Sequence, residues 1–220
     1  MAVTEGVPGL AREATVPAAL GGTPAFPEGL PLTRVQVPDR EELARRFEAI
    51  LDSGQLTNGA TVRELEETAA ALLDVPHVVA VSSCTSGLML ALQALGVAKH
   101  RVVMPSFTFS ATAHAAHWAG GEPVFAEITP DTLTLDPASA AAAIDAAQFP
   151  PERQARALMA THVYGTPCDV EGLQAVADER AVPLLYDAAH AFGSRRGGVP
   201  VGGFGAAEVF SLSPTKVVVA

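Results

Sequence analysis

The sequence is poor in cysteine and in positive charge, and it has no long apolar run. Its two cysteines, Cys84 and Cys168, favour reduced thiols of a cytoplasmic protein over a disulfide framework. The net charge of −10 argues against nucleic acid as a partner, because phosphates attract a basic face. No apolar run approaches the roughly 20 residues that span a bilayer, and the N-terminus lacks the pattern of a secretory signal. We therefore expect a cytoplasmic protein without a membrane partner.

Familiar ligand motifs are absent as well. No GxxxxGK[ST] is present, which excludes a P-loop. The stretch GGVPVGGFG (197–205) does not place GxGxxG between a strand and a helix, which argues against a dinucleotide fingerprint. His162 and Cys168 lack the spacing of metal ligands, so we expect no metal.

The composition, with 49% hydrophobic and 17% charged residues, is typical of a globular protein. Residues 1–38 are rich in Pro, Gly and Ala without a helical or strand period, which predicts a mobile arm. Residues 39–220 then form one domain. It opens with two expected helices, DREELARRFEAILDSG and TVRELEETAAALLDV. Asp39 can cap the first and Gly54 can end it, and the second has an apolar stripe of Leu65, Ala69, Leu72 and Leu73.

From Val78 onward, short apolar runs alternate with Ala-rich helical runs. The predicted strands are residues 78–81, 101–105, 123–128, 155–163, 182–189 and 207–212. Asp136 and Pro137 are good first residues for the helical run that follows the third of them. Runs without clean alternation are typical of strands buried on both faces. The sequence therefore predicts an α/β fold, with a mostly parallel sheet flanked by helices.

Ligands of such sheets bind outside the carboxyl ends of the strands. The polar residues that follow the predicted strands are therefore the candidates: Ser82, Ser83, Thr85, Ser86, Ser106, Thr108, His162, Tyr164, Asp187, His190, Ser211, Ser213 and Lys216.

Three of these stretches suggest chemistry, although each also has a plain structural explanation. SSCTSG (82–87) starts a helix and can bind phosphate through N–H groups and hydroxyls, but ordinary N-capping needs the same residues. Asp187 can pair with the ring nitrogen of pyridoxal phosphate, or it can be a helix cap or half of a buried salt bridge. Lys216 can form a Schiff base with an aldehyde, or it can be a surface lysine. The three stretches would thus bind a phosphate, a pyridinium and an aldehyde, which are the functional groups of pyridoxal phosphate.

Taken together, several motifs resemble the DegT/StrS group of sugar aminotransferases, which are fold-type I pyridoxal-phosphate enzymes. They include SSCTSGLMLALQALGV, PSFTFSATAHAAHWAGGEPVF, HVYGTPCDV, YDAAHAFGS and VFSLSPTK, within a resemblance that spans about residues 50–220. The resemblance implies that Lys216 is the catalytic Schiff-base lysine and that Asp187 pairs with the pyridine nitrogen. It also implies that Thr85, Ser86 and Ser211 hold the phosphate, that Phe109 stacks on the ring, and that His190 lies near the 3-hydroxyl.

The resemblance further implies ping-pong transamination from an amino donor, typically glutamate, to a keto-sugar linked to a nucleotide. Relatives with cyclitol and aminobenzoate products leave the acceptor open. Some relatives carry histidine in place of this lysine and dehydrate their substrates, so Lys216 favours transamination. Members of the group are homodimers with shared active sites, and QLTNG (55–59) is a candidate for reaching the neighbouring site.

Members of the group continue past the lysine into a smaller C-terminal domain, whereas this sequence ends at Ala220. We therefore expect an incomplete large domain. Two alternatives remain open at this point: a catalytically silent remnant or structural subunit that pairs with a full-length partner, and a cofactor-free doubly wound binding domain.

Overall fold

The computed structural model describes residues 16–31, 35, 39–146, 150 and 154–216. Residues 1–15, 32–34 and 36–38 of the predicted arm lie outside these residues, as does the end of the helical run at 147. The chain divides into two units, residues 1–36 and 37–220. In the first unit, the 3-10 helix η1 (Ala18–Leu20) ends at Gly21, which has a left-handed φ of 95°. The mobility of the arm stays a prediction.

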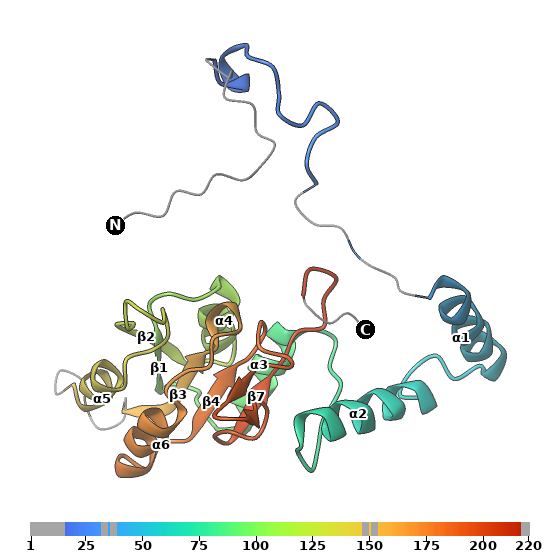
Figure 1. Ribbon diagram of the computed structural model, residues 1–220. Coiled ribbons are helices and arrows are strands. Elements are labelled where there is room, and N and C mark those ends of the chain that lie inside the picture. Colours follow the sequence, from blue (N-terminus) through green and yellow to red (C-terminus); the bar gives the residue numbers. More distant parts are fainter. Residues whose placement is uncertain (1–15, 32–34, 36–38, 147–149, 151–153, 217–220) are drawn as a thin grey trace. The chain divides into compact units, whose positions relative to one another are not determined.

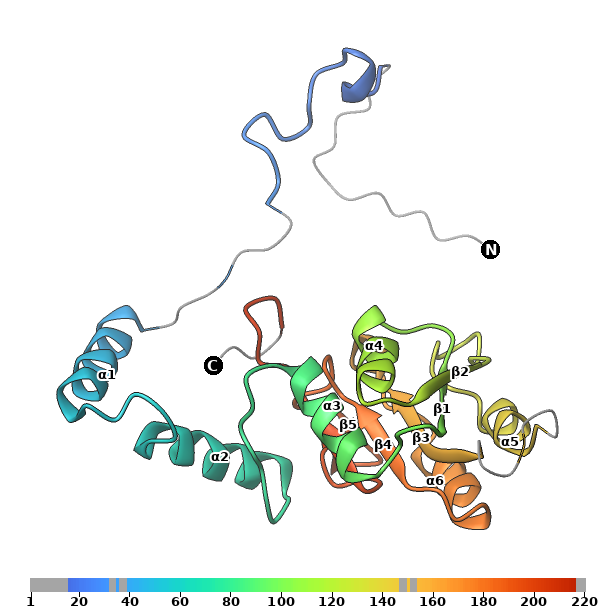
Figure 2. The ribbon, with the colours of Figure 1, turned by 180° about the vertical axis from the view of Figure 1, so that it is seen from behind.

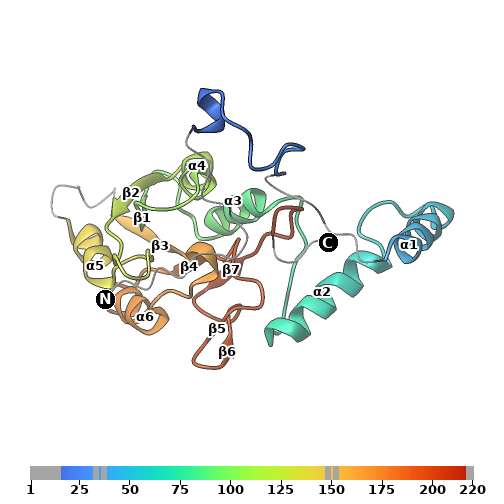
Figure 3. The same ribbon diagram turned by 45° about the horizontal axis from the view of Figure 1, so that its top comes forward.

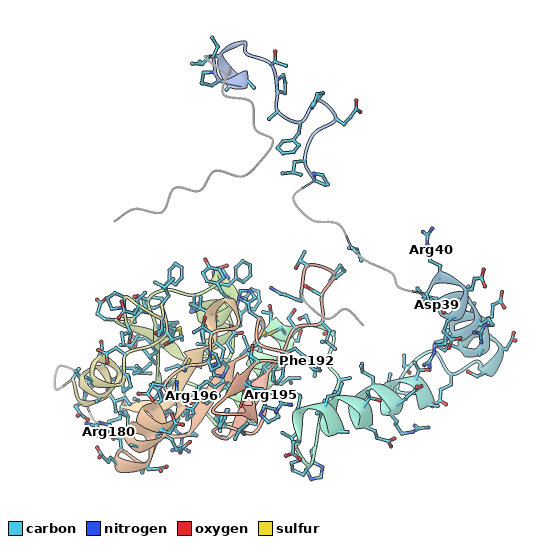
Figure 4. The ribbon with its side chains drawn as sticks, viewed as in Figure 1. Asp39, Arg40, Arg180, Phe192, Arg195 and Arg196 are labelled. Carbon is cyan, nitrogen blue, oxygen red and sulfur yellow. The ribbon has the colours of Figure 1, made fainter. Side chains whose placement is uncertain are left out.

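The second unit begins with two helices whose ends follow the expected rules (Figure 1). In α1 (Arg40–Ser53), the Asp39 carboxylate accepts the Glu42 N–H at 2.8 Å, and Gly54 ends the helix at φ 66°, so both predicted caps are confirmed. Figure 4 labels Asp39 and Arg40 at this start of α1. In α2 (Ala60–Leu73), Ala69 and Leu73 are buried.

Leu72 is exposed, so the predicted apolar stripe of α2 is wrong at this residue. The two buried residues, Ala69 and Leu73, are four positions apart on the helix.

Five parallel strands form the sheet, in the order β2-β1-β3-β4-β7. The strands are β1 (Arg101–Pro105), β2 (Glu122–Ala126), β3 (Ala155–Thr161), β4 (Leu184–Asp187) and β7 (Ala207–Val209). The register pairs Thr161 with Asp187 and Asp187 with Val209. The carboxyl ends of β3, β4 and β7 therefore meet at one edge, and the predicted α/β fold with a mostly parallel sheet is confirmed.

Helices cover both faces of the sheet, which Figures 1 and 2 view from opposite sides. Helices α3 (Cys84–Ala94) and α4 (Ser110–Trp118) pack against Met104, Met159 and Leu185. Helices α5 (Pro137–Asp145) and α6 (Val170–Glu179) pack against the alternate strand residues, among them Leu158 and Tyr186. Because both faces are covered, the strands lack polar alternation, as the sequence indicated. The Asp136 cap and the first-position Pro137 of α5 are also confirmed.

The prediction of a strand at residues 78–81 is wrong. This segment has no regular secondary structure, and Val79 is largely exposed. The backbone N–H of Ala80 donates to the Glu66 carboxylate at 2.8 Å, so it is not available to a neighbouring strand. Apolar residues alone therefore did not identify a strand at this position.

A short hairpin follows the loop after β4 and consists of β5 (Arg195–Arg196) and β6 (Val199–Pro200), as Figure 3 shows. Figure 4 labels its two arginines. The Arg196 guanidinium donates to Glu171 at 2.8 Å and to Asp169 at 3.3 Å. These ion pairs tie the hairpin to the beginning of α6.

A buried polar cluster connects the ends of β3 and β7. The His162 and Glu208 side chains are fully buried, and the His162 ring stacks on Tyr186 at a centroid distance of 4.6 Å. Glu208 Oε1 accepts the backbone N–H groups of Gly202 and Phe204. Its Oε2 lies 3.4 Å from His162 Nε2 without making a hydrogen bond. Glu208 thereby fixes the loop that enters β7.

Among the helices of the described residues, none combines the length and apolar character needed to cross a membrane.

Candidate active site at the carboxyl edge of the sheet

Asp187 is the centre of the candidate site. It is the last residue of β4 and its residue surface is only 4% exposed. Oδ2 accepts from the Thr112 hydroxyl at 2.7 Å, and Oδ1 accepts from the Ala189 N–H at 3.1 Å. Each carboxylate oxygen can accept two hydrogen bonds, so both keep capacity for another donor. A buried carboxylate in this arrangement is suited to bind a cationic N–H group.

A chain of three threonine hydroxyls leads to Asp187. Thr112 donates its one hydroxyl proton to Asp187, so in its 2.7 Å contact with Thr108 it must accept. Thr108 then donates to Thr112 and accepts from Thr161, 3.1 Å away. These hydrogen bonds therefore run in one direction, from Thr161 through Thr108 and Thr112 to the carboxylate. They connect β3, α4 and β4.

Replacing Thr112 with valine tests this chain. The change removes a charge-assisted hydrogen bond within a buried group, so we expect the free energy of unfolding to fall by about 2 kcal/mol. Urea denaturation of the two proteins measures the difference. Thr61→Val is the matched control, because Thr61 is an exposed helical threonine in α2, and we expect a change of less than about 0.5 kcal/mol. Equal effects of the two substitutions would contradict the proposed hydrogen-bond chain.

The predicted phosphate residues Thr85 and Ser86 lie in the first turn of α3. Ser83 is the N-cap, and its hydroxyl oxygen accepts the Ser86 N–H at 3.1 Å. The Ser86 hydroxyl is also 2.9 Å from that of Ser83. The capping function that the sequence left open is therefore present. The eleven-residue helix still directs its N-terminal partial positive charge toward this turn.

Gly87 allows this helix start to approach β7 closely. A Cβ atom at Gly87 would lie 2.7 Å from Val209 Cγ1 and 3.2 Å from Val81 Cγ2. The Cys84 thiol also donates to the Val209 carbonyl at 3.6 Å. Val209 is two residues before Ser211, so this contact brings the predicted phosphate residues of α3 near the segment that follows β7.

Gly87→Ala should therefore disturb the packing of α3 on β7. We expect a loss of about 1–2 kcal/mol in the free energy of unfolding, because the overlap outweighs the better helix propensity of alanine. Adding Val209→Ala removes the overlapping methyl group and should restore part of the loss in a double-mutant cycle measured by denaturation. Strictly additive effects would show that the contact with Val209 is not the cause.

The charges of Lys216 and Asp187 both affect the pKa values of His190 and Cys84. Burial lowers the pKa of His190, the positive charge of Lys216 lowers it further, and Asp187 raises it. Burial and Asp187 raise the pKa of Cys84 to about 12, while Lys216 lowers it. The structure thus gathers residues from α3, β4 and the segment after β7, as the sequence predicted for the rim. Lys216 is half-buried, and its backbone N–H donates to the Ser213 carbonyl at 2.9 Å.

The remaining predicted site residues, Phe109 and Ser211, lie in the segments that follow β1 and β7. Phe109 is the N-cap residue of α4, next to Thr108 of the hydroxyl chain, and it is 72% exposed. An aromatic ring with this exposure is available to stack on a ligand. Ser211 follows β7 and is half-buried, and its hydroxyl oxygen accepts the Ser213 N–H at 3.5 Å. Their contacts with a ligand stay predictions.

Sequence reasoning missed the part played by Thr112. A signal was present in FTFSAT, where Thr108 and Thr112 are four residues apart and share one helix face. Their partner Asp187 is 75 residues further along the chain, and no local pattern identifies it.

Comparison with known proteins identifies the family to which the chain is similar. Residues 38–220 match the DegT/DnrJ/EryC1/StrS aminotransferase family. The chain is 36% identical over 192 residues to the spore coat polysaccharide biosynthesis protein SpsC of Bacillus subtilis, covering 87% of this chain and 46% of that protein. It is 36% identical over 165 residues to the dTDP-4-amino-4,6-dideoxy-D-glucose transaminase of Escherichia coli, covering 74% of this chain and 42% of that protein.

Solved structures show the same fold. The crystal structure of DesI, determined in the presence of its TDP-sugar product, matches with a TM-score of 0.80 and 43% identity. The match covers 90% of this chain and 49% of DesI. The chain therefore spans about half the length of the relatives that it matches.

Proposed function

Because the chain belongs to the DegT/DnrJ/EryC1/StrS aminotransferase family, we propose that it provides the pyridoxal-phosphate site of a sugar aminotransferase. The observation that carries the proposal is the buried Asp187 carboxylate at the end of β4, together with Lys216, whose charge acts on the same His190 and Cys84 side chains as that of Asp187. A carboxylate that stays paired with a pyridinium and a lysine that reacts with an aldehyde are the two groups that this chemistry requires.

The residues of the edge fit the cofactor. Asp187 keeps acceptor capacity on both oxygens for the ring N–H. Thr85 and Ser86 at the start of α3, together with Ser211, would hold the phosphate, and the exposed Phe109 would cover one ring face. His190 would lie beside the 3-oxygen. When bound, the cofactor supplies an aldehyde for the amino group and a ring that takes up an electron pair.

The chain's own residues then have separate tasks. Lys216 Nζ would bond to the cofactor aldehyde at rest and, once released, would take the proton from Cα of the amino donor and return it as an acid. Asp187 would hold the ring nitrogen protonated, which its buried position and its two fixed hydrogen bonds support. The Thr161–Thr108–Thr112 chain would keep the carboxylate in this orientation.

Titration with pyridoxal phosphate tests the proposal. We expect an absorbance band at the edge of the visible range, and we expect glutamate to bleach it as the amino group transfers. A band that glutamate never bleaches would favour a catalytically silent subunit that pairs with a full-length partner. The absence of any band would refute both and leave a cofactor-free binding domain.

We further propose glutamate as the amino donor and a nucleotide-linked keto-sugar as the acceptor. DesI has a TDP-sugar product, and the Escherichia coli relative is named for a dTDP-linked amino sugar, which supports this substrate class. After glutamate has transferred its amino group to the cofactor, incubation of the protein with dTDP-linked keto-sugars should return the absorbance band. Return of the band with 2-oxoglutarate only reverses the transfer from glutamate, so it serves as the positive control. If 2-oxoglutarate returns the band and none of the keto-sugars does, the sugar assignment is refuted.

We also propose a cytoplasmic homodimer in which residues 55–59 reach the neighbouring site. Helix α1 contains no buried residue, and its exposed side chains include the apolar Phe47 and Leu51. A second copy that covers this face would account for it.

A further inference from the structure

The turn η3 (Val163–Gly165) follows β3 and has an unusual backbone. Tyr164 has φ 53° and ψ 21°, and Gly165 has φ 81°. A left-handed conformation is unfavourable for tyrosine, so surrounding contacts must hold it. The amino-transfer chemistry proposed above gives Tyr164 no task.

The contacts that hold this turn lead to His190. The Tyr164 backbone N–H donates to His190 Nδ1 at 3.3 Å. The two rings are nearly parallel, with an interplanar angle of 3° and centroids 6.1 Å apart. Phe107 adds an edge-on contact to Tyr164, with ring centroids 6.2 Å apart. The left-handed conformation of Tyr164 therefore directs its backbone N–H at Nδ1 of His190.

Gly165 fixes the other side of the turn. A Cβ atom there would lie 3.0 Å from the His190 carbonyl oxygen and 3.3 Å from Ser194 Oγ. The Ser194 hydroxyl donates to the Gly165 carbonyl at 2.8 Å. The turn thus lies directly against the loop that carries His190 and has little freedom to move away from it.

This geometry determines which nitrogen of His190 carries the proton. A neutral imidazole has one donor nitrogen and one acceptor nitrogen. Because Nδ1 accepts from Tyr164, the proton must be on Nε2. The charged groups that act on the ring are Lys216 and Asp187, and burial and Lys216 lower the pKa of His190. The hydrogen bond to Nδ1 and the lowered pKa of His190 both favour the neutral form with its proton on Nε2.

We propose that the Tyr164–Gly165 turn is a positioning element that fixes the neutral Nε2–H tautomer of His190, so that His190 is a hydrogen-bond donor to the cofactor. The second half of this statement rests on the proposed function. With the other tautomer, Nε2 would be an acceptor and could not donate to an oxygen of the ring.

Nitrogen NMR of the cofactor-free chain tests the first half directly. The chain has six histidines, and the signals of His190 are those missing from His190→Gln. Above the pH at which His190 titrates, we expect the pattern of an Nε2–H imidazole and a scalar coupling between the Tyr164 nitrogen and His190 Nδ1. An Nδ1–H pattern, or an even mixture of the two tautomers, would overturn the proposal.

Gly165→Ala perturbs the turn and should convert the single tautomer into a mixture. Gly198→Ala is the matched control: its φ of 87° imposes a similar backbone strain, but an added Cβ would have no atom within 4 Å. We expect Gly198→Ala to keep the Nε2–H pattern. If both variants keep it, the turn does not set the tautomer.

Two substitutions of His190 test the donor role. Glutamine places an N–H group near the position of Nε2, whereas asparagine ends near Nδ1. We expect the dissociation constant for pyridoxal phosphate to rise about tenfold in His190→Asn and by clearly less in His190→Gln. The opposite order would overturn the donor role. A parent chain that shows the Nε2–H pattern but never binds pyridoxal phosphate would refute the proposed function and the donor role, and leave the tautomer assignment intact.

Discussion

Replacement of Lys216 with alanine is expected to eliminate the absorbance band with pyridoxal phosphate and to lower amino transfer at least about 10³-fold. The substitution removes the amine that bonds to the aldehyde, and it also removes the base that moves the Cα proton. Spectrophotometric titration and the rate of bleaching by glutamate measure the two losses. The half-buried position of Lys216 predicts little change in the free energy of unfolding, so the loss should be chemical.

Lys99 provides the control because it is the other lysine of the chain. It is exposed in the turn before β1, with φ 67°, and its backbone N–H donates to the Gly120 carbonyl at 2.7 Å. Asparagine tolerates such a left-handed backbone, so Lys99→Asn should fold normally and keep both the band and the bleaching. A band that survives in Lys216→Ala and disappears in Lys99→Asn would reverse the assignment.

Asp187→Asn should have the second largest effect. The amide keeps the shape of the carboxylate and removes the charge that holds the ring nitrogen protonated. We expect the band to form, since Lys216 is intact, but we expect bleaching by glutamate to slow about 10²–10³-fold. Stopped-flow absorbance separates the formation of the band from its bleaching.

Asp178→Asn is a suitable comparison, because Asp178 lies on α6 and its carboxylate accepts only from the Gln174 amide among the contacts described. It should leave both rates unchanged. If Asp187→Asn bleached as fast as the parent chain, the buried carboxylate would not act on the ring, and the proposed function would lose its main support.

Much of the fold could be predicted from the sequence, because each buried strand appears as a short apolar run of neighbouring residues. Five of the six predicted strands are present, although β4 and β7 are shorter than expected. The segment at 78–81 looked equally apolar, but the Ala80 N–H is bound to Glu66, fourteen residues away. Such a partner depends on tertiary packing, which periodicity does not reveal.

The candidate site was predictable to the same extent. Parallel strands place their carboxyl ends at one edge, so the sequence predicted that Asp187, His190 and Lys216 would lie on one rim. The hydrogen bonds that orient these groups did not follow. Thr112 reaches Asp187 across 75 residues, and Tyr164 reaches His190 through a backbone conformation that tyrosine rarely adopts. Both depend on neighbours that only the folded chain brings together.

If the chain provides the proposed site, pyridoxal phosphate bonds to one particular amine, the Nζ atom of Lys216. Incubating the protein with pyridoxal phosphate, reducing with borohydride and mapping the peptides by mass spectrometry tests it most directly, because the chain has only Lys99 and Lys216 as lysine candidates. We expect the added mass of the reduced cofactor on the peptide that contains Lys216 and none on the peptide that contains Lys99. Equal labelling of both peptides, or labelling of Lys99 alone, would contradict the account.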